Sequence, residues 1–75
     1  MRVTVLWFAA LRERRGVASE VVEVPPGTTL AALYAQCVPA DRIPVAHVRN
    51  QRVCPGDEPV ADGDEVAFLP PLGGG

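Results

Sequence analysis

The sequence predicts one small α+β domain in which a mixed sheet of about five strands packs against one main helix and a short one. Three observations lead to this fold class. The chain has 75 residues, about half of the ~150 that serve as a prior for one domain. Short runs rich in β-branched and aromatic residues recur along it, which is typical of strands. Only one segment has the apolar spacing of a longer helix, and one helix covers one face of a sheet.

The first strand is predicted over residues 3–8, a segment of β-branched and aromatic residues. Both alternating sets of positions in it are mainly apolar, so we expect a central strand that is buried on both faces. Helix-forming residues follow over 9–15 and stop at Gly16, a residue that commonly caps the C-terminal end of a helix. A short helix of about two turns is therefore predicted between the first two strands.

The main helix follows a second strand, which is predicted over residues 19–24 and closed by a Pro-Pro-Gly sequence. Thr28 or Thr29 is suited to cap this helix, because a hydroxyl oxygen there can accept a hydrogen bond from an N–H of the first turn. Pro39 ends the helix. The helix is predicted from apolar residues at positions i, i+3, i+4 and i+7, which are Leu30, Leu33, Tyr34 and Cys37.

The remaining segments are predicted to form three short strands. Residues 44–48 and 52–53 are joined through an Asn-Gln pair, which is suited to a hairpin turn. An Asp-Gly-Asp turn then begins the last strand, over residues 65–69. Two opening strands, one main helix and three later strands describe a β-grasp domain over residues 1–71.

The charge pattern excludes nucleic acid as an expected partner. Nine acidic residues against seven basic ones give a formal charge of −2, and no basic stripe stands out. The densest positive patch is Arg12, Arg14 and Arg15, which we interpret as a solvated helix face. All seven basic residues are arginine, so the chain carries no side-chain amine. Its longest apolar run is far shorter than the roughly 20 residues that a membrane-spanning helix needs, so no membrane association is expected.

The cysteines offer no metal site. Cys37 and Cys54 lie far apart in the sequence, and His47 is the only histidine. These residues are too few and too scattered for a zinc site or an iron–sulfur cluster. We expect two free thiols, which suit a reducing cytoplasm, and the sequence assigns a role to neither.

The most specific feature is the end of the chain, where residues 70–75 are two prolines, one leucine and three glycines. Two prolines favour a stiff, extended spacer, and glycines without Cβ atoms let the backbone enter a narrow passage. The six residues beyond the last strand reach about 20 Å when extended. We predict that residues 72–75 form an extended, flexible tail, in which Gly73 and Gly74 let the carboxylate of Gly75 enter the active site of another protein.

Two segments resemble the family of small, sulfur-carrying subunits of molybdopterin synthase, which are ubiquitin-like sulfur carriers. They read VLWFAALRE at residues 5–13 and DGDEVAFLPP at residues 62–71. The likeness covers nearly the full chain and is weaker in the middle. Sulfur carriers of thiamine synthesis share the glycine end but usually lack the double proline. Gly73 departs from the family, which often has Ser or Thr there.

The resemblance implies a sulfur carrier that is not an enzyme on its own. A partner adenylating enzyme, related to ubiquitin activators, would use ATP to adenylate Gly75, and a persulfide donor would then leave a thiocarboxylate there. The chain itself would bind no cofactor and no metal. The sulfur would pass to a pterin precursor of the molybdenum cofactor in the large synthase subunit, and two small subunits would flank a dimer of large ones in the cytoplasm.

The resemblance also implies where the partners bind. Family members dock through apolar sheet residues beside the root of the tail, and the corresponding residues here are Phe8, Phe68, Leu69 and Leu72. For Phe8 and Phe68 the alternative is simple core packing. Two other functions stay open: a related carrier that delivers sulfur for the thiamine thiazole, tRNA thiolation or cysteine, and a β-grasp interaction module that carries no sulfur.

Overall fold

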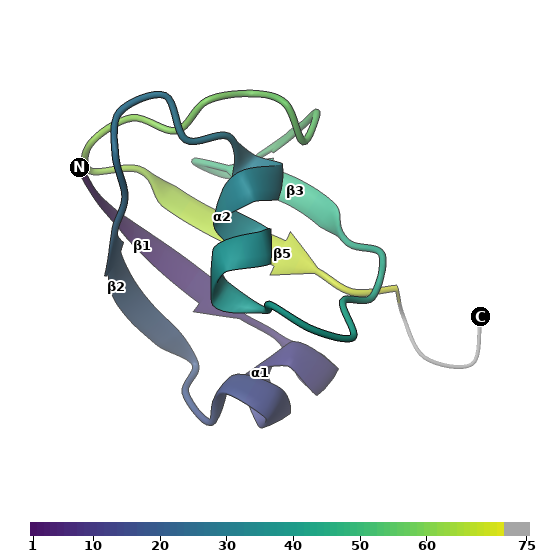
Figure 1. The fold of residues 1–75 in the computed structure, drawn as a ribbon. Helices are drawn as coiled ribbons and strands as arrows, with labels where there is room; N and C mark the ends of the chain where they lie inside the picture. Colours follow the sequence, from purple (N-terminus) through teal and green to yellow (C-terminus); the bar gives the residue numbers. More distant parts are fainter. Residues whose placement is uncertain (72–75) are drawn as a thin grey trace.

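The computed structural model describes residues 1–71, which form a five-stranded sheet and two helices (Figure 1). In chain order the elements are β1 (Arg2–Trp7), α1 (Ala9–Arg15), β2 (Ser19–Glu23), α2 (Leu30–Cys37), β3 (Ala46–Arg49), β4 (Arg52–Cys54) and β5 (Glu65–Leu69). Residues 72–75 lie outside the described range. The tail predicted there, and the roles predicted for Leu72, Gly73, Gly74 and Gly75, therefore stay predictions.

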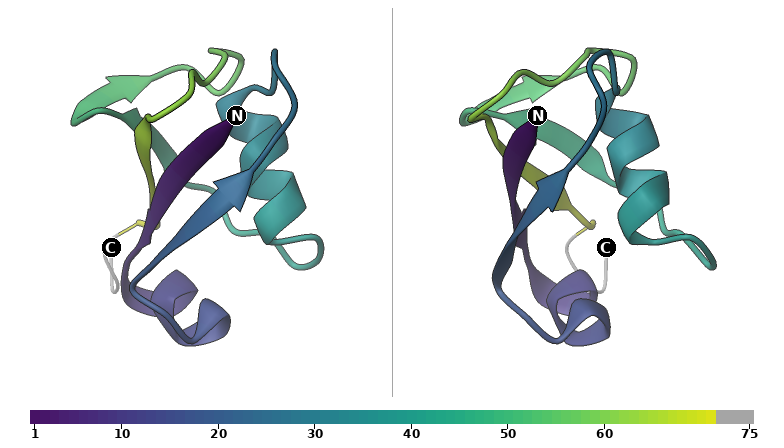
Figure 2. Two further views of the ribbon diagram at one scale, coloured as in Figure 1. Left: turned by 90° about the vertical axis from the view of Figure 1, so that its left-hand side faces the viewer. Right: turned by 60° about the vertical axis from the view of Figure 1, so that its left-hand side comes forward.

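The sheet is mixed, and β5 is its central strand. The strand order is β2-β1-β5-β3-β4, in which β1 and β5 are parallel and the other neighbours are antiparallel. Helix α2 lies across one face of the sheet, and α1 lies at the end where β1 finishes (Figure 2). The predicted α+β fold, a β-grasp with one main helix and one short helix, is confirmed.

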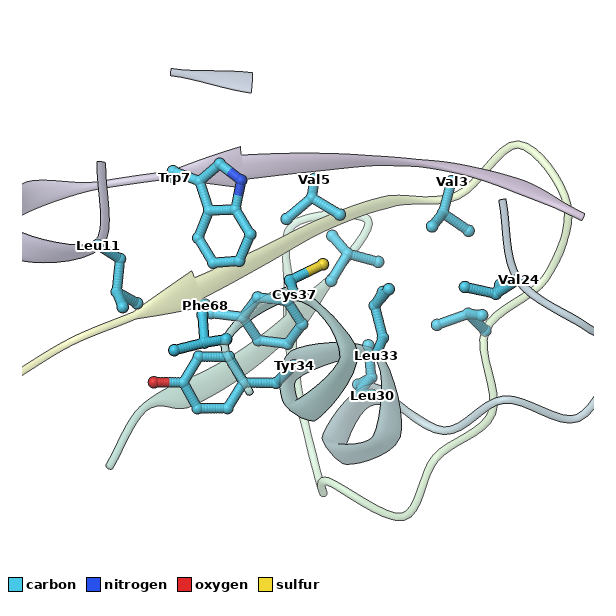
Figure 3. Close-up of a cluster of buried hydrophobic side chains, with 13 residues drawn as sticks. Val3, Val5, Trp7, Leu11, Val24, Leu30, Leu33, Tyr34, Cys37 and Phe68 are labelled. Carbon is cyan, nitrogen blue, oxygen red and sulfur yellow. The ribbon is translucent and has the colours of Figure 1, made fainter. Parts of the chain in front are cut away.

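The core fills the space between α2 and the inner face of the sheet (Figure 3). Val3, Val5 and Trp7 of β1 point into it, and all four residues of the predicted apolar stripe of α2 are buried. Phe68 of β5 is 0% exposed. Its ring centroid lies 5.6 Å from that of Trp7 and 4.9 Å from that of Tyr34, distances at which aromatic pairs stabilise a core beyond their buried area.

Strand β1 is buried on one face only, so the expectation of burial on both faces was wrong. Val3, Val5 and Trp7 are buried, whereas Thr4 and Leu6 between them are half-buried. Helix α2 covers the inner face, and neither helix of residues 1–71 covers the outer face. An apolar residue at every position does not distinguish a strand covered on both sides from a strand whose second face stays open.

Several strand boundaries also differ from the prediction. Strand β1 covers Arg2–Trp7 instead of residues 3–8, β3 ends at Arg49 instead of residue 48, and β4 ends at Cys54 instead of residue 53. Strand β2 ends at Glu23 instead of residue 24, although the N–H of Val24 still donates to the carbonyl oxygen of Met1 at 2.9 Å. Strand β3 begins at Ala46 instead of residue 44. Pro44 has no backbone N–H and therefore adds no donor to the sheet ladder.

The predicted caps and turns form where local residue types require them. Gly16 ends α1 with a φ of 78°, a left-handed conformation that glycine adopts without steric cost. Thr29 caps α2, since its side chain accepts a hydrogen bond from the N–H of Ala32 at 3.1 Å. Asn50 and Gln51 join β3 to β4 with φ values of 51° and 67°, as a type I′ hairpin turn requires.

Arg12, Arg14 and Arg15 of α1 are all exposed, as the interpretation of a solvated helix face predicts, and two of them are also hydrogen-bonded. Arg15 donates from Nη2 and Nε to the carboxylate of Glu20 at 2.6 and 2.9 Å, and Trp7 Nε1 donates to the same carboxylate at 2.7 Å. The hydrogen bond from Arg15 lowers the pKa of Glu20, against the effect of burial. Arg14 binds backbone carbonyls of a distant loop, while Arg12 is exposed as predicted.

The buried carboxylate of Asp64 connects the β3–β4 hairpin to the start of β5. It accepts hydrogen bonds from Arg49 Nε at 2.6 Å, Asn50 Nδ2 at 3.0 Å and the N–H of Ala61 at 2.7 Å. Burial acts to raise the pKa of Asp64, but these hydrogen bonds outweigh it, and the pKa lies below its usual value. Asn50 in turn accepts from the N–H of Glu65 at 3.0 Å, so one carboxylate fixes the register of two neighbouring strands.

Replacing Asp64 by Asn should lower the free energy of unfolding by about 2 kcal/mol, because charge-assisted hydrogen bonds to a buried group are lost. Urea unfolding at neutral pH, followed by the fluorescence of Trp7, measures this change. Asp57→Asn is the matched control, since Asp57 is exposed and its replacement should change the stability by less than about 0.5 kcal/mol. Equal stabilities of the two variants would contradict the role assigned to Asp64.

The same carboxylate should make stability depend on pH. Because the pKa of Asp64 is lower in the folded chain than in the unfolded one, its stabilisation is fully present above the unfolded-state pKa of about 3.9 and is lost as the pH falls through the folded-state pKa. The free energy of unfolding, measured at a series of pH values, should decrease less steeply below about pH 4 for Asp64→Asn than for the wild type. Parallel curves would contradict this linkage.

Candidate functional site

The outer face of the sheet, which α2 leaves uncovered, carries a row of apolar side chains across four strands. Because successive side chains of a strand point to opposite faces, the residues between the buried ones face outward. Leu6 pairs with Ala67, Ala67 with Val48, and Val48 with Val53, so the four side chains lie side by side. Val53 is 78% exposed. We call these four residues, together with Phe8, Ala46 and Leu69, the outer apolar face.

Phe8 and Leu69 lie at the end of this face where β5 finishes. Leu69 is the last residue of β5 and pairs with Ala46 of β3. Phe8 directly follows Trp7, the last residue of β1, and Trp7 is the register partner of Phe68, which directly precedes Leu69. Phe8 is 44% and Leu69 is 37% exposed. Two large apolar side chains therefore meet solvent immediately before the chain leaves the sheet at Pro70.

A cavity of about 330 Å³ opens at this same end of the sheet. We call it the tail-root cavity. Proline rings and aliphatic side chains form its walls, so it suits apolar groups. One wall comes from the segment that enters β3 and the other from the segment that leaves β5; the lining residues are Pro44, Val45, Ala46, Leu69, Pro70 and Pro71.

A larger depression of about 460 Å³ lies beside α1, between residues 9 and 18. None of the predicted site residues lines it. Its walls include the charged side chains of Arg12 and Glu13, and it lies apart from the tail-root cavity. We therefore place the candidate site at the outer apolar face and the tail-root cavity.

Of the four predicted partner-contact residues, the structure places two on the surface. Phe8 and Leu69 are both exposed, and each directly follows one residue of the Trp7–Phe68 register pair. Phe68 is fully buried between β1 and α2, so it is a core residue and its side chain is not available to a partner in this structure. Leu72 lies outside the described residues.

Sequence reasoning missed the rest of the face, namely Leu6, Ala46, Val48, Val53 and Ala67. Each of β1, β3, β4 and β5 has at least one apolar residue at an outward position, although Arg2 and Thr4 of β1 and Glu65 of β5 also face outward. These positions were not grouped because the strand order was unknown. Only the pairing of β5 with both β1 and β3 brings them together.

Neither cysteine is set up as a nucleophile. Both are free thiols; Cys37 is buried and Cys54 is half-buried. Burial raises the pKa of Cys37, and the neighbouring Glu58 carboxylate raises that of Cys54. A raised pKa keeps each sulfur in its less reactive thiol form.

The part of the chain that the structure describes contains no group of three or more His, Cys, Asp or Glu placed to hold a metal ion. Among residues 1–71 there is also no helix with the length and apolar character to cross a membrane. The site is therefore built from an apolar surface and the root of the C-terminal segment.

Comparisons with known proteins give a consistent picture. The model of the ThiS family matches residues 5–75. A molybdopterin synthase sulfur carrier subunit of Chlamydomonas reinhardtii is 37% identical over the whole of both chains. One of Escherichia coli is 35% identical over 97% of this chain and 99% of its own. A structure of a putative molybdopterin converting factor subunit 1 from Pyrococcus furiosus superposes with a TM-score of 0.85 at 27% identity, and covers 96% of this chain and 99% of its own.

Proposed function

Because the chain belongs to the ThiS family, we propose that it is a sulfur carrier, and that it acts as the small subunit of molybdopterin synthase. The observation that carries this proposal is the 37% identity to a molybdopterin synthase sulfur carrier subunit over the full length of both chains. The fold supports it, since residues 1–71 form a small domain with an exposed apolar face beside the point where the chain leaves the sheet. The chain is the sulfur-donating subunit of a complex, and the catalytic pocket belongs to the partner.

Gly75 is the residue that bears the sulfur in this proposal. A carboxylate is a poor electrophile, so a ubiquitin-activator-like enzyme first joins it to AMP, using ATP and releasing pyrophosphate. The terminal sulfur of a donor persulfide then attacks the acyl carbon and expels AMP. A second thiol cleaves the sulfur–sulfur bond, which leaves a thiocarboxylate on Gly75 and a disulfide. ATP is bound by the activating enzyme, and the carrier needs no cofactor.

The described residues fix where this chain end leaves the domain. Phe68 anchors β5 in the core, and Leu69, the next residue, ends the strand and is exposed. Pro70 and Pro71 follow, whose rings hold φ near −65° and which have no N–H to add to the sheet. The glycines beyond them have no side chain to obstruct a narrow entrance.

The outer apolar face is the surface on which the large subunit docks. Single chains seldom leave a broad apolar patch open to water unless it binds something. This face is continuous from Val53 to Leu69 and ends at the tail-root cavity, so a partner that covers it also receives the chain end. We place two carriers on a dimer of large subunits, in the cytoplasm.

Intact-mass analysis of the chain purified from its host should find a fraction in which one oxygen atom is replaced by sulfur at Gly75. Deletion of Gly75 should abolish sulfur transfer to the pterin precursor while the domain keeps its stability, because the carboxylate, now on Gly74, ends about 3.5 Å short of its place in the partner's active site and the core is untouched. Co-purification of the large synthase subunit would separate this function from that of a related sulfur carrier. An interaction module without sulfur chemistry would keep all its activity after the deletion, which is the outcome that contradicts the proposal.

Leu69→Asp should weaken binding to the large subunit by at least about tenfold, because a charge replaces an apolar contact where the outer apolar face meets the root of the C-terminal segment. Isothermal titration calorimetry measures the affinity. Val17→Asp is the matched control, since Val17 is 44% exposed but lies beside the depression next to α1. Both variants should remain folded. Equal affinities of the two variants would remove the outer apolar face from the interface.

A further inference from the structure

We propose that Arg14 is a positioning residue for the C-terminal segment, which it controls through the loop that forms one wall of the tail-root cavity. This inference rests on the proposed function, since it assigns Arg14 a part in presenting Gly75 to the activating enzyme. Arg14 lies on α1, on a different element from every residue that lines the cavity.

The connection between α2 and β3 is held by side chains that bind its backbone carbonyls. Arginine and tyrosine donors reach six of the seven carbonyl oxygens from residue 37 to residue 43. The donors are Arg14, Arg15, Tyr34 and Arg42, and the acceptors are the carbonyl oxygens of Cys37, Val38, Pro39, Ala40, Asp41 and Ile43. Residues 39–42 of this connection are exposed, so these hydrogen bonds give its carbonyl oxygens fixed partners in place of water.

Arg14 holds the most strained point of this loop. Its Nη1 donates to the carbonyl oxygen of Asp41 and its Nη2 to that of Ala40, both at 2.7 Å. Asp41 has a φ of 54°, in the left-handed region that costs a residue with a Cβ about 1 kcal/mol. The planar fork of a guanidinium fixes two acceptors at once. Arg14 therefore maintains a backbone conformation that the loop would otherwise leave.

The conformation at Ala40 and Asp41 determines where the cavity wall lies. Three residues beyond Asp41 the chain reaches Pro44, and residues 44–46 form one side of the tail-root cavity. Ala46 then pairs with Leu69, the residue from which the C-terminal segment starts. Tyr34 fixes the same stretch from the other side, since its hydroxyl donates to the carbonyl oxygen of Ile43 at 2.8 Å.

Because Arg14 fixes this wall of the cavity before a partner binds, the entropic cost of docking should be lower. A partner that receives the chain end must immobilise the residues at the start of the C-terminal segment, which costs conformational entropy. Part of this entropy is already lost in the free protein when the cavity wall holds those residues in place. Loss of Arg14 should therefore weaken the encounter with the activating enzyme and leave the chemical step unchanged once the chain end is bound.

The test compares Arg14→Gln with Arg12→Gln, which makes the same change of charge at an exposed position of the same helix. Tyr34→Phe, which removes the second anchor of the loop, is the independent variant. Two quantities are measured for each chain: the amide hydrogen-exchange rates of Ala46 and Leu69, and the KM and kcat of ATP-dependent adenylation by the activating enzyme. Unfolding curves verify that each variant is folded.

Arg14→Gln and Tyr34→Phe should both accelerate exchange at Ala46 and Leu69 and raise KM about fivefold with kcat unchanged, while Arg12→Gln matches the wild type. Unchanged exchange in Arg14→Gln overturns the inference, and so does faster exchange with an unchanged KM, because the contact would then be structural only. If the wild-type chain is not adenylated at all, the proposed function fails and the role of Arg14 at the tail root is decided by the exchange rates alone.

Discussion

The burial of Phe68 is the constraint on which the rest of the structure depends. Its ring packs against Trp7 of β1, Tyr34 of α2 and His47 of β3, so one side chain of the central strand contacts both neighbouring strands and the main helix. Aromatic groups with large buried areas dominate the stability of small cores. Because Phe68 is two residues from Pro70, the same contacts that hold the sheet together also fix the point where the chain leaves it.

The small size of the chain explains why the outer face is apolar and open. A domain of this length buries only about 60% of the surface of its unfolded chain, and its single long helix covers only the inner face of the sheet. A second layer would need more residues than the chain has between its strands. The two helices of residues 1–71 thus leave the outer face open, and in the proposed carrier this arrangement would put the docking surface beside the reactive chain end.

Local sequence signals predicted the elements well, but they did not predict the contacts between distant elements. The four-residue stripe of α2, the cap at Gly16 and the turn at Asn50 and Gln51 each depend on neighbours a few residues away, and all are confirmed. The contact of Arg14 with Ala40 joins residues far apart in the sequence, and nothing in the spacing of charges near Arg14 indicates it. Asp64 was assigned to a turn, yet its burial depends on the hairpin that packs beside it. Phe68 could not be assigned to core or surface until the register of β5 was known.

A carrier with an activated end must also not react with itself, and the side chains of this domain meet that requirement. All seven basic residues are arginine, and guanidinium groups stay protonated and are not nucleophiles at neutral pH. Cys37 is buried, and the raised pKa values of Cys37 and Cys54 keep both sulfurs as thiols. An acyl-adenylate at Gly75 would therefore meet no side-chain amine on its own domain, and both of the domain's cysteines would be in the less reactive thiol form.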